Sequence, residues 1–175
     1  MKLLFFVVNQ SPFNIELVDH LYNYLPKGSS VKIILQNKME LCRSQWGLKT
    51  CINPIEILER PRKLELFLEQ EKPEVVVYTS YRSSGFMKAK RWARKHGVKF
   101  FVHCSEKLIE YKRSSFFIWL KYQLFKYRTS GVNGITAAGN RAMDLYQKHC
   151  GAPCLCVPYT FDMTRLLDFR PLPYD

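Results

Sequence analysis

Short runs of apolar residues alternate along this sequence with longer stretches in which apolar residues recur every three or four positions. Several of the short runs contain no polar residue, which is typical of strands in a parallel sheet that is covered on both faces. We expect strands at Leu3–Val8, Val31–Leu35, Val75–Tyr78, Val98–Val102, Gly134–Ala137 and Leu155–Val157. The longer stretches predict amphipathic helices at Asn14–Tyr24, Pro61–Glu71, Gly85–His96, Ser114–Arg128 and Asn140–His149.

The alternation of strand and helix predicts the fold class. Pro61 marks the start of one predicted helix, and Gly97 and Gly151 follow the ends of two others. Repeated strand, helix and strand units with right-handed crossovers form a doubly wound, mainly parallel α/β sheet with helices on both faces, a Rossmann-like arrangement. Between Gln36 and Leu58 neither period is clear.

Composition limits the classes of protein that fit. The chain has 175 residues, of which 47% are hydrophobic, so it is long and apolar enough to form a domain with a core. Its net charge of +12 favours a polyanionic partner such as nucleic acid, a sugar nucleotide or an anionic membrane. Its six cysteines lack a disulfide framework spacing, which favours a reducing compartment, the cytoplasm.

The sequence predicts neither a metal site nor a membrane-spanning helix. The cluster of His149, Cys150, Cys154 and Cys156 has no second ligand pair at the spacing of a structural zinc site, so we expect no metal. No apolar run reaches the roughly 18 residues that a spanning helix needs. The chain is therefore expected to be soluble or peripheral to a membrane.

Polar residues follow the predicted strands, where ligands bind in an open parallel sheet. These candidate cleft residues are Asn9, Gln10, Ser11, Thr79, Ser80, Tyr81, Glu106 and Asn140. His103 ends the strand that contains Phe101 and Val102, and its imidazole can hydrogen-bond a sugar hydroxyl or an oxyanion, which makes it the candidate catalytic residue. The alternatives are that these are ordinary loop polars, that Asn140 caps its helix, and that His103 is a structural histidine.

The first turn argues against a bound dinucleotide cofactor. A dinucleotide-binding domain carries Gly-x-Gly-x-x-Gly after its first strand, whereas this turn is Asn9-Gln10-Ser11-Pro12-Phe13. No Gly-x-x-x-x-Gly-Lys loop occurs either. NAD, FAD and ATP are therefore disfavoured, and no cofactor is expected.

The helix predicted at Ser114–Arg128 has two apolar stripes. At 100° per residue we expect one stripe to face the core, and its members are Phe116, Phe117, Leu120, Leu124 and Tyr127. We expect the opposite stripe to dock on an anionic leaflet together with its flanking cations, a set made up of Ile118, Lys121, Tyr122, Phe125, Lys126 and Arg128. The alternative is that an upstream loop or another subunit covers this second stripe.

The segments Val75–Tyr78, Ala93–Val98 and Phe101–His103 resemble the first domain of family 4 glycosyltransferases, which have the two-domain GT-B architecture. The end of the chain is similar too. A strand at Gly134–Ala137 and a helix are followed there by Gly151, a short strand and the stretch Val157–Asp162.

The resemblance implies an enzyme, a retaining transferase that moves a sugar from a nucleotide diphosphate donor to a glycan or lipid-linked acceptor, as in polysaccharide biosynthesis. It assigns acceptor binding to residues 1–162, and it makes 163–175 the linker to a donor-binding domain with a Glu-x7-Glu motif, so the chain alone is expected to be inactive. His103 matches the family's histidine near the transferred sugar, whereas Asn9, Gln10 and Ser11 stand where many members have paired glycines. Members with lipid-linked acceptors often dock at membranes through a basic, aromatic helix.

Two other functions fit part of this sequence. A non-catalytic subunit that anchors a separate transferase at the inner face of a membrane would use the same helix surface. A nucleic-acid-binding module is favoured by charge alone, because the sequence has no reading motif and no aromatic stacking sheet. We therefore expect no nucleic-acid partner.

Overall fold

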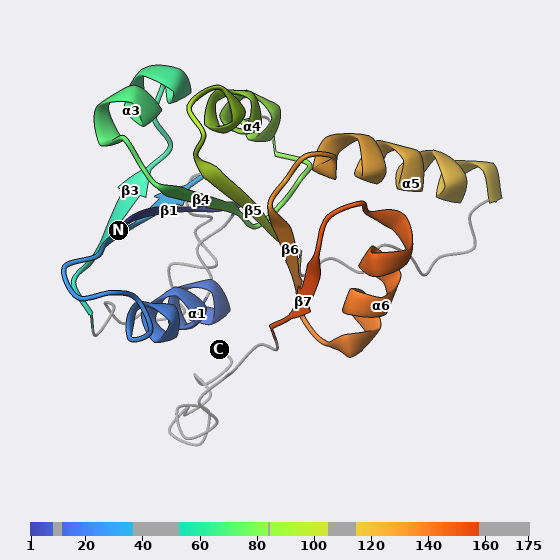
Figure 1. Ribbon diagram of the computed structural model, residues 1–175, viewed down its shortest axis with the longest axis horizontal. Helices are drawn as coiled ribbons and strands as arrows, with labels where there is room; N and C mark the ends of the chain where they lie inside the picture. Colours follow the sequence, from blue (N-terminus) through green and yellow to red (C-terminus); the bar gives the residue numbers. More distant parts are fainter. Residues whose placement is uncertain (9–11, 37–52, 84, 105–114, 158–175) are drawn as a thin grey trace, which may run out of the picture.

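The computed structural model describes residues 1–8, 12–36, 53–83, 85–104 and 115–157 (Figure 1). Its seven strands are β1 (Lys2–Val7), β2 (Ser30–Leu35), β3 (Ile55–Glu59), β4 (Val75–Tyr78), β5 (Lys99–Cys104), β6 (Gly134–Ala137) and β7 (Cys154–Cys156). Its five described helices are α1 (Pro12–Tyr22), α3 (Leu64–Glu71), α4 (Phe86–Lys95), α5 (Ser115–Thr129) and α6 (Asn140–His149).

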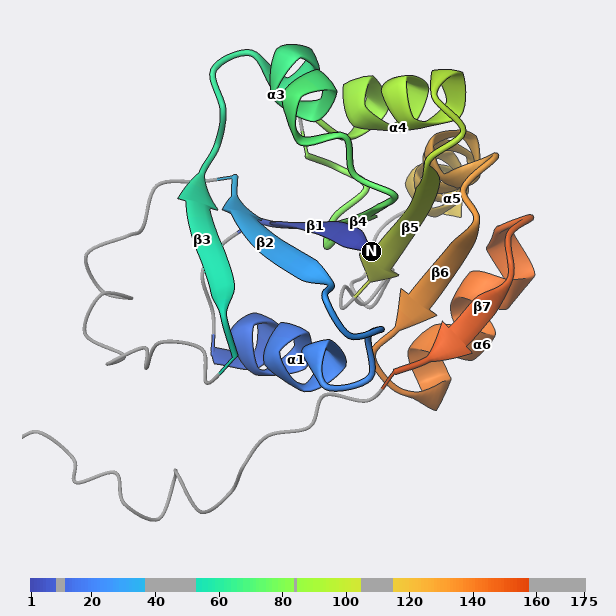
Figure 2. The same ribbon diagram turned by 60° about the vertical axis from the view of Figure 1, so that its left-hand side comes forward.

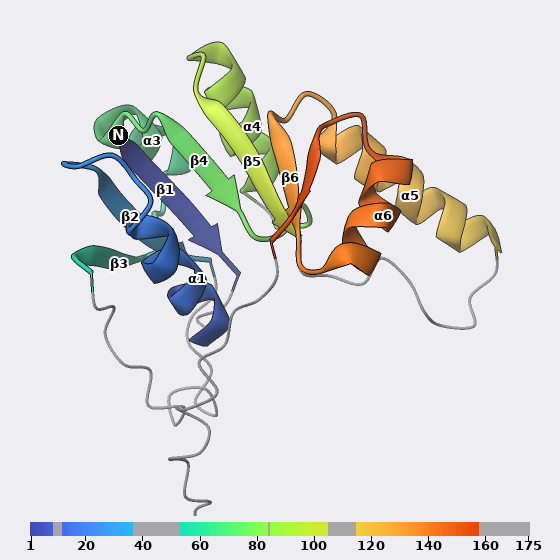
Figure 3. The same ribbon diagram turned by 60° about the horizontal axis from the view of Figure 1, so that its bottom comes forward.

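The strands form one sheet in the order β3-β2-β1-β4-β5-β6-β7, and each neighbouring pair is parallel. The arrowheads of β1, β4 and β5 accordingly point the same way in Figure 3. Helices pack on both faces of the sheet, so the predicted α/β, Rossmann-like fold class is confirmed.

Strand β3 was not predicted. Its sequence, Ile-Glu-Ile-Leu-Glu, has two acidic residues in five positions and is half-exposed or exposed throughout. It lies at the edge of the sheet and pairs only with β2, where Ile55 lies opposite Val31. Because an edge strand is covered less than a central one, it carries no continuous apolar run that a sequence pattern would detect.

The start of α3 differs from the prediction. The helix begins at Leu64, three residues after Pro61. The connection from β3 to β4 must pass β2 and β1 in this strand order, and residues 60–63 form its first, non-helical part. Gly97 follows α4 with a positive φ of 67°, a conformation that glycine adopts without strain, as its place after a helix end predicts.

Alternate residues of the central strands face two separate cores. Leu4, Phe6 and Val76 pack with α3, α4, α5 and α6 on one face. Leu3, Phe5 and Val77 pack with α1 on the other. Figure 2 shows α1 on one side of the sheet and the pair α3 and α4 on the opposite side. The period of two thus assigns each strand side chain to a face.

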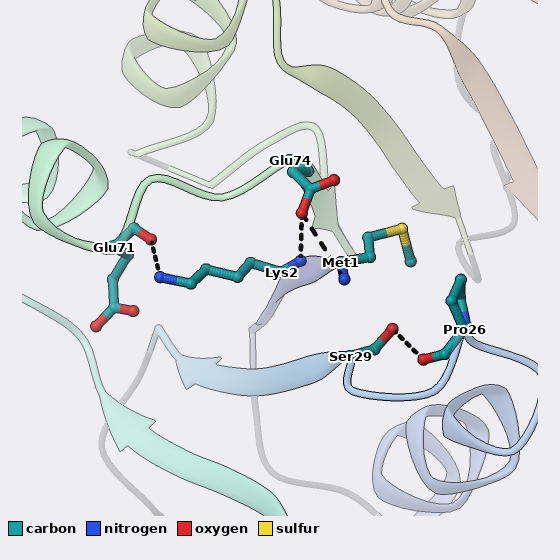
Figure 4. Close-up of polar contacts among 6 residues, drawn as sticks. All are labelled: Met1, Lys2, Pro26, Ser29, Glu71 and Glu74. Carbon is teal, nitrogen blue, oxygen red and sulfur yellow. Dashed lines mark hydrogen bonds and ion pairs between the residues drawn. The ribbon is translucent and has the colours of Figure 1, made fainter.

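Polar contacts near the amino-terminal ends of the strands hold the sheet in register (Figure 4). The backbone N–H of Lys2 donates to Glu74 Oε1 at 3.1 Å, and Lys2 Nζ donates to the Glu71 carbonyl at 3.3 Å. Ser29 Oγ donates to the Pro26 carbonyl at 2.6 Å just before β2. The two Lys2 contacts join the start of β1 to Glu71 and Glu74, which precede β4, whereas the Ser29 contact lies within the turn before β2.

The assignment of the two stripes of α5 was wrong. Phe125 is fully buried, and its ring lies edge-on to Tyr81 at 5.0 Å and tilted against Tyr146 at 5.2 Å. The residues expected in the core are instead 45–68% exposed, and these are Phe116, Phe117, Leu120, Leu124 and Tyr127. Both stripes are apolar, so helical periodicity alone could not choose between them.

The reversal changes the residues expected to dock. Phe125 and the half-buried Tyr122 pack in the core, and Ile118 is also half-buried. Lys121 and Arg128 are half-buried at the edge of the helix, and Lys126 is exposed. Ile118, Tyr122 and Phe125 therefore do not form an outward docking stripe.

The carboxyl-terminal end of α5 is fastened by hydrogen bonds. Arg128 Nη1 donates to the Tyr81 carbonyl at 2.9 Å, and Lys90 Nζ donates to the carbonyls of Arg128 and Ser130 at 2.6 and 3.1 Å. The amino-terminal end extends away from the other elements (Figures 1 and 3). Among the described residues, α5 and the other helices are too short or too polar to cross a bilayer.

Candidate functional site

The strand order creates a switch point between β1 and β4. The chain leaves β1 through α1 toward β2, on one side, and leaves β4 through α4 toward β5, on the other. In open parallel sheets a crevice forms where two such connections diverge, beyond the carboxyl ends of the strands. This edge of β1 and β4 is therefore the first place to look for a ligand.

Thr79 joins the two strands at this edge. Its backbone N–H donates to the Phe6 carbonyl at 2.9 Å, and its Oγ1 accepts a hydrogen bond from the N–H of Val8 at 3.1 Å. The side chain is 7% exposed. Thr79 thus lies at the predicted edge. Its two hydrogen bonds join the end of β4 to the end of β1, which is a structural role.

His103 lies on β5, next to β4 and β6. Its Nδ1 is 2.8 Å from Thr136 Oγ1, the residue opposite it on β6. The residue before it, Val102, lies opposite Tyr78, so Thr79 reaches the same row from the other side. Because neighbouring strands are about 4.8 Å apart, this register places Thr79, His103 and Thr136 side by side across the sheet, and His103 and Thr136 are joined by the hydrogen bond. We call these three residues the polar row.

The row faces the side of the sheet that carries α1. Phe101, two residues before His103, packs in the core beneath α1, and side chains two apart on a strand share a face. Thr136 is half-exposed and its neighbour on β7, Leu155, is 65% exposed. The polar row thus runs from a buried end at Thr79 toward an open end at β7.

His103 is held neutral. The side chain is 1% exposed, and burial lowers the pKa of the imidazole from 6.5 to about 4. A neutral imidazole can donate a hydrogen bond to a sugar hydroxyl or accept one from it, but it supplies no positive charge to a pyrophosphate. Its burial also means that His103 is not presented to bulk solvent, so its catalytic assignment stays a prediction.

The residues after Thr79 have structural roles. Ser80 is 6% exposed, and its Oγ accepts a hydrogen bond from the Arg82 N–H at 3.2 Å. Tyr81 is 1% exposed and packs against Phe125 in the main core. The prediction that the Tyr81 side chain lines the cleft is therefore wrong, because its ring is directed into the core beneath α5.

Asn140 is the first residue of α6, directly after the β6 edge. The capping position is held by Gly139, with φ at 93°, and no side-chain cap is made there. The Asn140 side chain is exposed, so the alternative that it caps its helix is not supported, and its place in a cleft stays a prediction. The predicted site residues Asn9, Gln10, Ser11 and Glu106 lie outside the described residues.

Three further polar residues were not predicted as site residues. Thr136 is the hydrogen-bond partner of His103, and its signal was a lone hydroxyl in the short apolar run of β6. Gln36 directly follows β2 and is 8% exposed. Glu16, in the helix that follows β1, is also 8% exposed. Buried carboxylates and amides of this kind are uncommon. Of the two, Gln36 is placed at the sheet edge, where its backbone N–H donates to the Val7 carbonyl at 2.8 Å, which makes it a candidate for holding a ligand hydroxyl.

The cysteines divide into two groups. Cys104 is 2% exposed in the core, whereas Cys42 and Cys51 lie outside the described residues. Cys150 and Cys154 lie with their Sγ atoms 3.1 Å apart, and burial raises the pKa of the Cys154 thiol. In the described part of the chain, no three His, Cys, Asp or Glu side chains gather as metal ligands would.

No protein-family model and no curated protein sequence matches this chain significantly. Solved structures do. TcCGT1 in complex with UDP is 11% identical, with a TM-score of 0.61 over 89% of this chain and 50% of that one. Arabidopsis thaliana UGT89C1 with UDP-L-rhamnose is 12% identical, with a TM-score of 0.61 over 98% and 56%.

A bacterial structure extends the likeness. Anabaena Alr3699/HepE in complex with UDP is 12% identical, with a TM-score of 0.58 over 94% of this chain and 45% of that one. This chain thus spans about half the length of each structure. The fold is that of one half of a GT-B glycosyltransferase. At these identities the likeness concerns the fold alone.

Proposed function

We propose that this chain is the acceptor-binding half of a retaining, family 4-type glycosyltransferase that uses a nucleotide-diphosphate sugar. The observation that carries the proposal is the row of Thr79, His103 and Thr136 beside the β1/β4 switch point of a GT-B-like half. Residues 1–162 form the acceptor-binding domain, and 163–175 lead toward a donor-binding domain. The acceptor is a glycan or a lipid-linked saccharide.

The transfer reaction needs no cofactor, because each bond that breaks is matched by one that forms. The bond between the anomeric carbon and the diphosphate oxygen breaks, and a bond forms between that carbon and the acceptor oxygen on the same face. The acceptor proton passes to the departing phosphate oxygen. A neutral His103, oriented through Thr136, holds a sugar hydroxyl in line, which is a positioning contribution that needs no strong protein base.

The uncharged imidazole also supports the assignment to the acceptor side. A diphosphate needs cations or oriented N–H groups, and His103 supplies no charge at neutral pH. The donor half is therefore expected to bind most of the nucleotide sugar. This division explains why the chain alone is proposed to be inactive.

A binding experiment tests the acceptor assignment directly. The purified chain is titrated with UDP, with UDP-glucose, and with a panel of glycans and lipid-linked saccharides, using calorimetry. We expect binding to an acceptor-class saccharide that falls at least tenfold in Thr136→Val, and no comparable nucleotide binding. Tight UDP binding without saccharide binding would reverse the assignment and make this the donor half.

A transfer assay tests His103. In the intact two-domain enzyme, His103→Ala is expected to lower turnover at least tenfold, with Ser83→Ala, a change at a half-buried loop residue, as the control. Wild-type turnover in His103→Ala would remove His103 from the catalytic machinery and leave it a structural histidine.

A second candidate is a non-catalytic subunit that anchors a separate transferase chain. The exposed apolar face of α5 and the burial of His103 favour it. Either way, we propose a cytoplasmic protein that associates peripherally with the inner face of a membrane and binds no nucleic acid. If transfer by the assembled enzyme depends on α5 but not on His103, the anchoring role is the correct one.

A further inference from the structure

A pocket of about 210 Å³ lies at the amino-terminal edge of the sheet, away from the candidate functional site. It is lined by the end of α4, the turn into β5, and the turn between α5 and β6. Strand β5 begins in this pocket at Lys99 and carries His103 near its other end. At about 3.3 Å per residue these two residues are about 13 Å apart, so the pocket is separate from the polar row.

Three cations line this pocket, and none of the described carboxylates does. The cations are Lys90, Arg94 and Lys99. Lys90 is half-buried, and burial together with the nearby charges of Arg94 and Arg128 lowers the pKa of its amine. The positive charges at this end of α4 are therefore close enough to repel one another.

One of the three cations has a structural role. Lys90 Nζ donates to the carbonyls of Arg128 and Ser130 at 2.6 and 3.1 Å, and a cation is favourable at the carboxyl-terminal end of a helix such as α5. Arg94 and Lys99 do not share this role. Their side chains are exposed and form no hydrogen bond or ion pair within the part of the chain that the structure describes.

Two carboxylates near this edge of the sheet are bonded elsewhere. Glu69 Oε1 accepts a hydrogen bond from Trp92 Nε1 at 2.8 Å. The Glu74 carbonyl accepts the N–H of Lys99 at 3.1 Å, but the Glu74 carboxylate accepts the N–H of Lys2 at 3.1 Å. Neither carboxylate lines the pocket, so the positive charge there is left for a ligand to balance.

Asn133 adds a fixed hydrogen-bond donor to the pocket. Its backbone N–H donates to the Phe100 carbonyl at 2.8 Å, and its Oδ1 accepts the Phe100 N–H at 2.7 Å. These two bonds hold the carboxamide in one orientation. Among the described residues nothing accepts a hydrogen bond from Asn133 Nδ2, so this amide nitrogen is available to a ligand in the pocket that Asn133 lines.

We propose that this pocket binds one small phosphate ligand, either inorganic phosphate or a small phosphate monoester. Arg94 and Lys99 supply charge-assisted hydrogen bonds to the phosphate oxygens, and Asn133 Nδ2 donates to a third oxygen. The pocket is smaller than the roughly 300–1,000 Å³ of sites for drug-sized ligands, which leaves room for a phosphate group and a few further atoms. The inference goes beyond the proposed function and does not depend on it.

The position of the pocket gives the bound phosphate a structural consequence. Its lining comes from the starts of β5 and β6, two neighbouring parallel strands whose other ends carry His103 and Thr136. A phosphate held by Arg94 and Lys99 on one side and by Asn133 on the other joins the two turns that lead into these strands. The ligand therefore stabilises the folded state, as any ligand that binds only the folded chain does.

Titration calorimetry of the purified chain at fixed ionic strength tests the site. We expect one phosphate to bind per chain with a dissociation constant on the order of 0.1 mM, as suits so small a ligand. Glycerol 3-phosphate is the monoester probe, with glycerol as its control. Binding of either probe supports the site, and the tighter of the two identifies the source of the phosphate. A lack of saturable binding by both probes up to about 10 mM would overturn the proposal.

A matched pair of charge changes locates the binding. Arg94→Gln with Lys99→Gln removes the two unpaired pocket cations and leaves Lys90 in place at the end of α5. Lys88→Gln with Arg91→Gln, the control, removes two exposed cations of α4 that do not line the pocket. The pocket variant should weaken phosphate binding by at least about tenfold, and the control by less than about threefold. Equal losses would show general attraction only and would overturn the site.

A change at Asn133 tests the third contact. Asn133→Asp keeps an oxygen that accepts the Phe100 N–H and replaces the Nδ2 donor by an anionic oxygen. Phosphate binding should fall by at least about tenfold, with little change in the urea midpoint of unfolding. Gln147→Glu, which lowers the net charge equally at an exposed position of α6, is the control. Wild-type affinity in Asn133→Asp would contradict the assigned contact.

Two competition experiments separate this site from other sources of phosphate. A single-stranded oligonucleotide that binds through Arg94 and Lys99 far more tightly than both small probes would identify nucleic acid as the ligand and contradict the proposal. UDP binding that is lost in Arg94→Gln with Lys99→Gln belongs to this pocket and supports the phosphate site. UDP binding that survives in this variant lies elsewhere and bears on the proposed function instead, so the two inferences fail independently.

Discussion

Replacement of Phe125 by alanine tests which side of α5 packs against the domain. Phe125 is fully buried, and its ring contacts Tyr81 and Tyr146. Truncating a buried phenylalanine to alanine costs about 3–5 kcal/mol, since apolar contacts are lost and a cavity remains. The two aromatic contacts, at about 0.5–1.5 kcal/mol each, are part of that loss.

The matched control is Phe117→Ala on the same helix. Phe117 is 60% exposed, and surface changes of this kind usually alter the free energy of unfolding by less than about 0.5 kcal/mol. Both variants remove the same atoms and change helix propensity equally. The difference between them therefore isolates the burial of one side of α5.

Urea unfolding followed by circular dichroism measures both variants. With an m value of about 2 kcal/mol per molar urea, Phe125→Ala should lower the midpoint by roughly 1.5–2.5 M, and Phe117→Ala by no more than about 0.3 M. A loss under about 1 kcal/mol at Phe125 combined with a loss above about 2 kcal/mol at Phe117 would refute the orientation of α5.

Three other predictions concern titration, thiols and an ion-pair network. Because His103 binds a proton near pH 6.5 when unfolded but near pH 4 when folded, its stabilising contribution is complete above pH 6.5 and falls as the pH drops. Between pH 7 and pH 5, the unfolding free energy of the wild type should fall by about 2 kcal/mol more than that of His103→Gln. Equal falls in the two proteins would contradict the lowered pKa of His103. Diamide oxidation should join Cys150 to Cys154, 3.1 Å apart, before it modifies the buried Cys104, with the loss of two hydrogens seen by mass spectrometry; a first bridge elsewhere would contradict this geometry. Lys32→Met, which leaves the two carboxylates that Lys32 contacts at 2.8 and 3.1 Å facing each other, should destabilise the fold by about 1 kcal/mol at pH 7 in urea titrations, and an unchanged urea midpoint would contradict the ion pairs.

The fold was largely predictable because most strands are buried on both sides. The runs around Phe5, Val76 and Phe100 are continuous in sequence, and each is buried in the sheet. Strand β3 escaped detection because its edge position permits glutamates at two of five positions. A strand that is buried on both faces shows a continuous apolar run in the sequence, whereas an edge strand need not.

The site was predictable only in part. The position of His103 at the end of β5 follows from its place after an apolar run, but its partner Thr136 depends on the register between β5 and β6, which no local pattern encodes. The burial of Phe125 depends likewise on Tyr81 and Tyr146, which lie far from it in sequence. Where two apolar stripes share one helix, the tertiary partners decide which of them is covered.

Helix α5 is attached to the rest of the domain mainly through its carboxyl-terminal half. Its carboxyl-terminal half is pinned through Phe125 and Arg128 to Tyr81, two residues after Thr79, while its amino-terminal half is exposed. We therefore expect a tilt of the amino-terminal half to strain the contacts to Tyr81 and, through its backbone, the loop that follows β4. The amide hydrogen exchange rates of that loop should therefore be the first to change when a ligand or partner binds the amino-terminal half of α5.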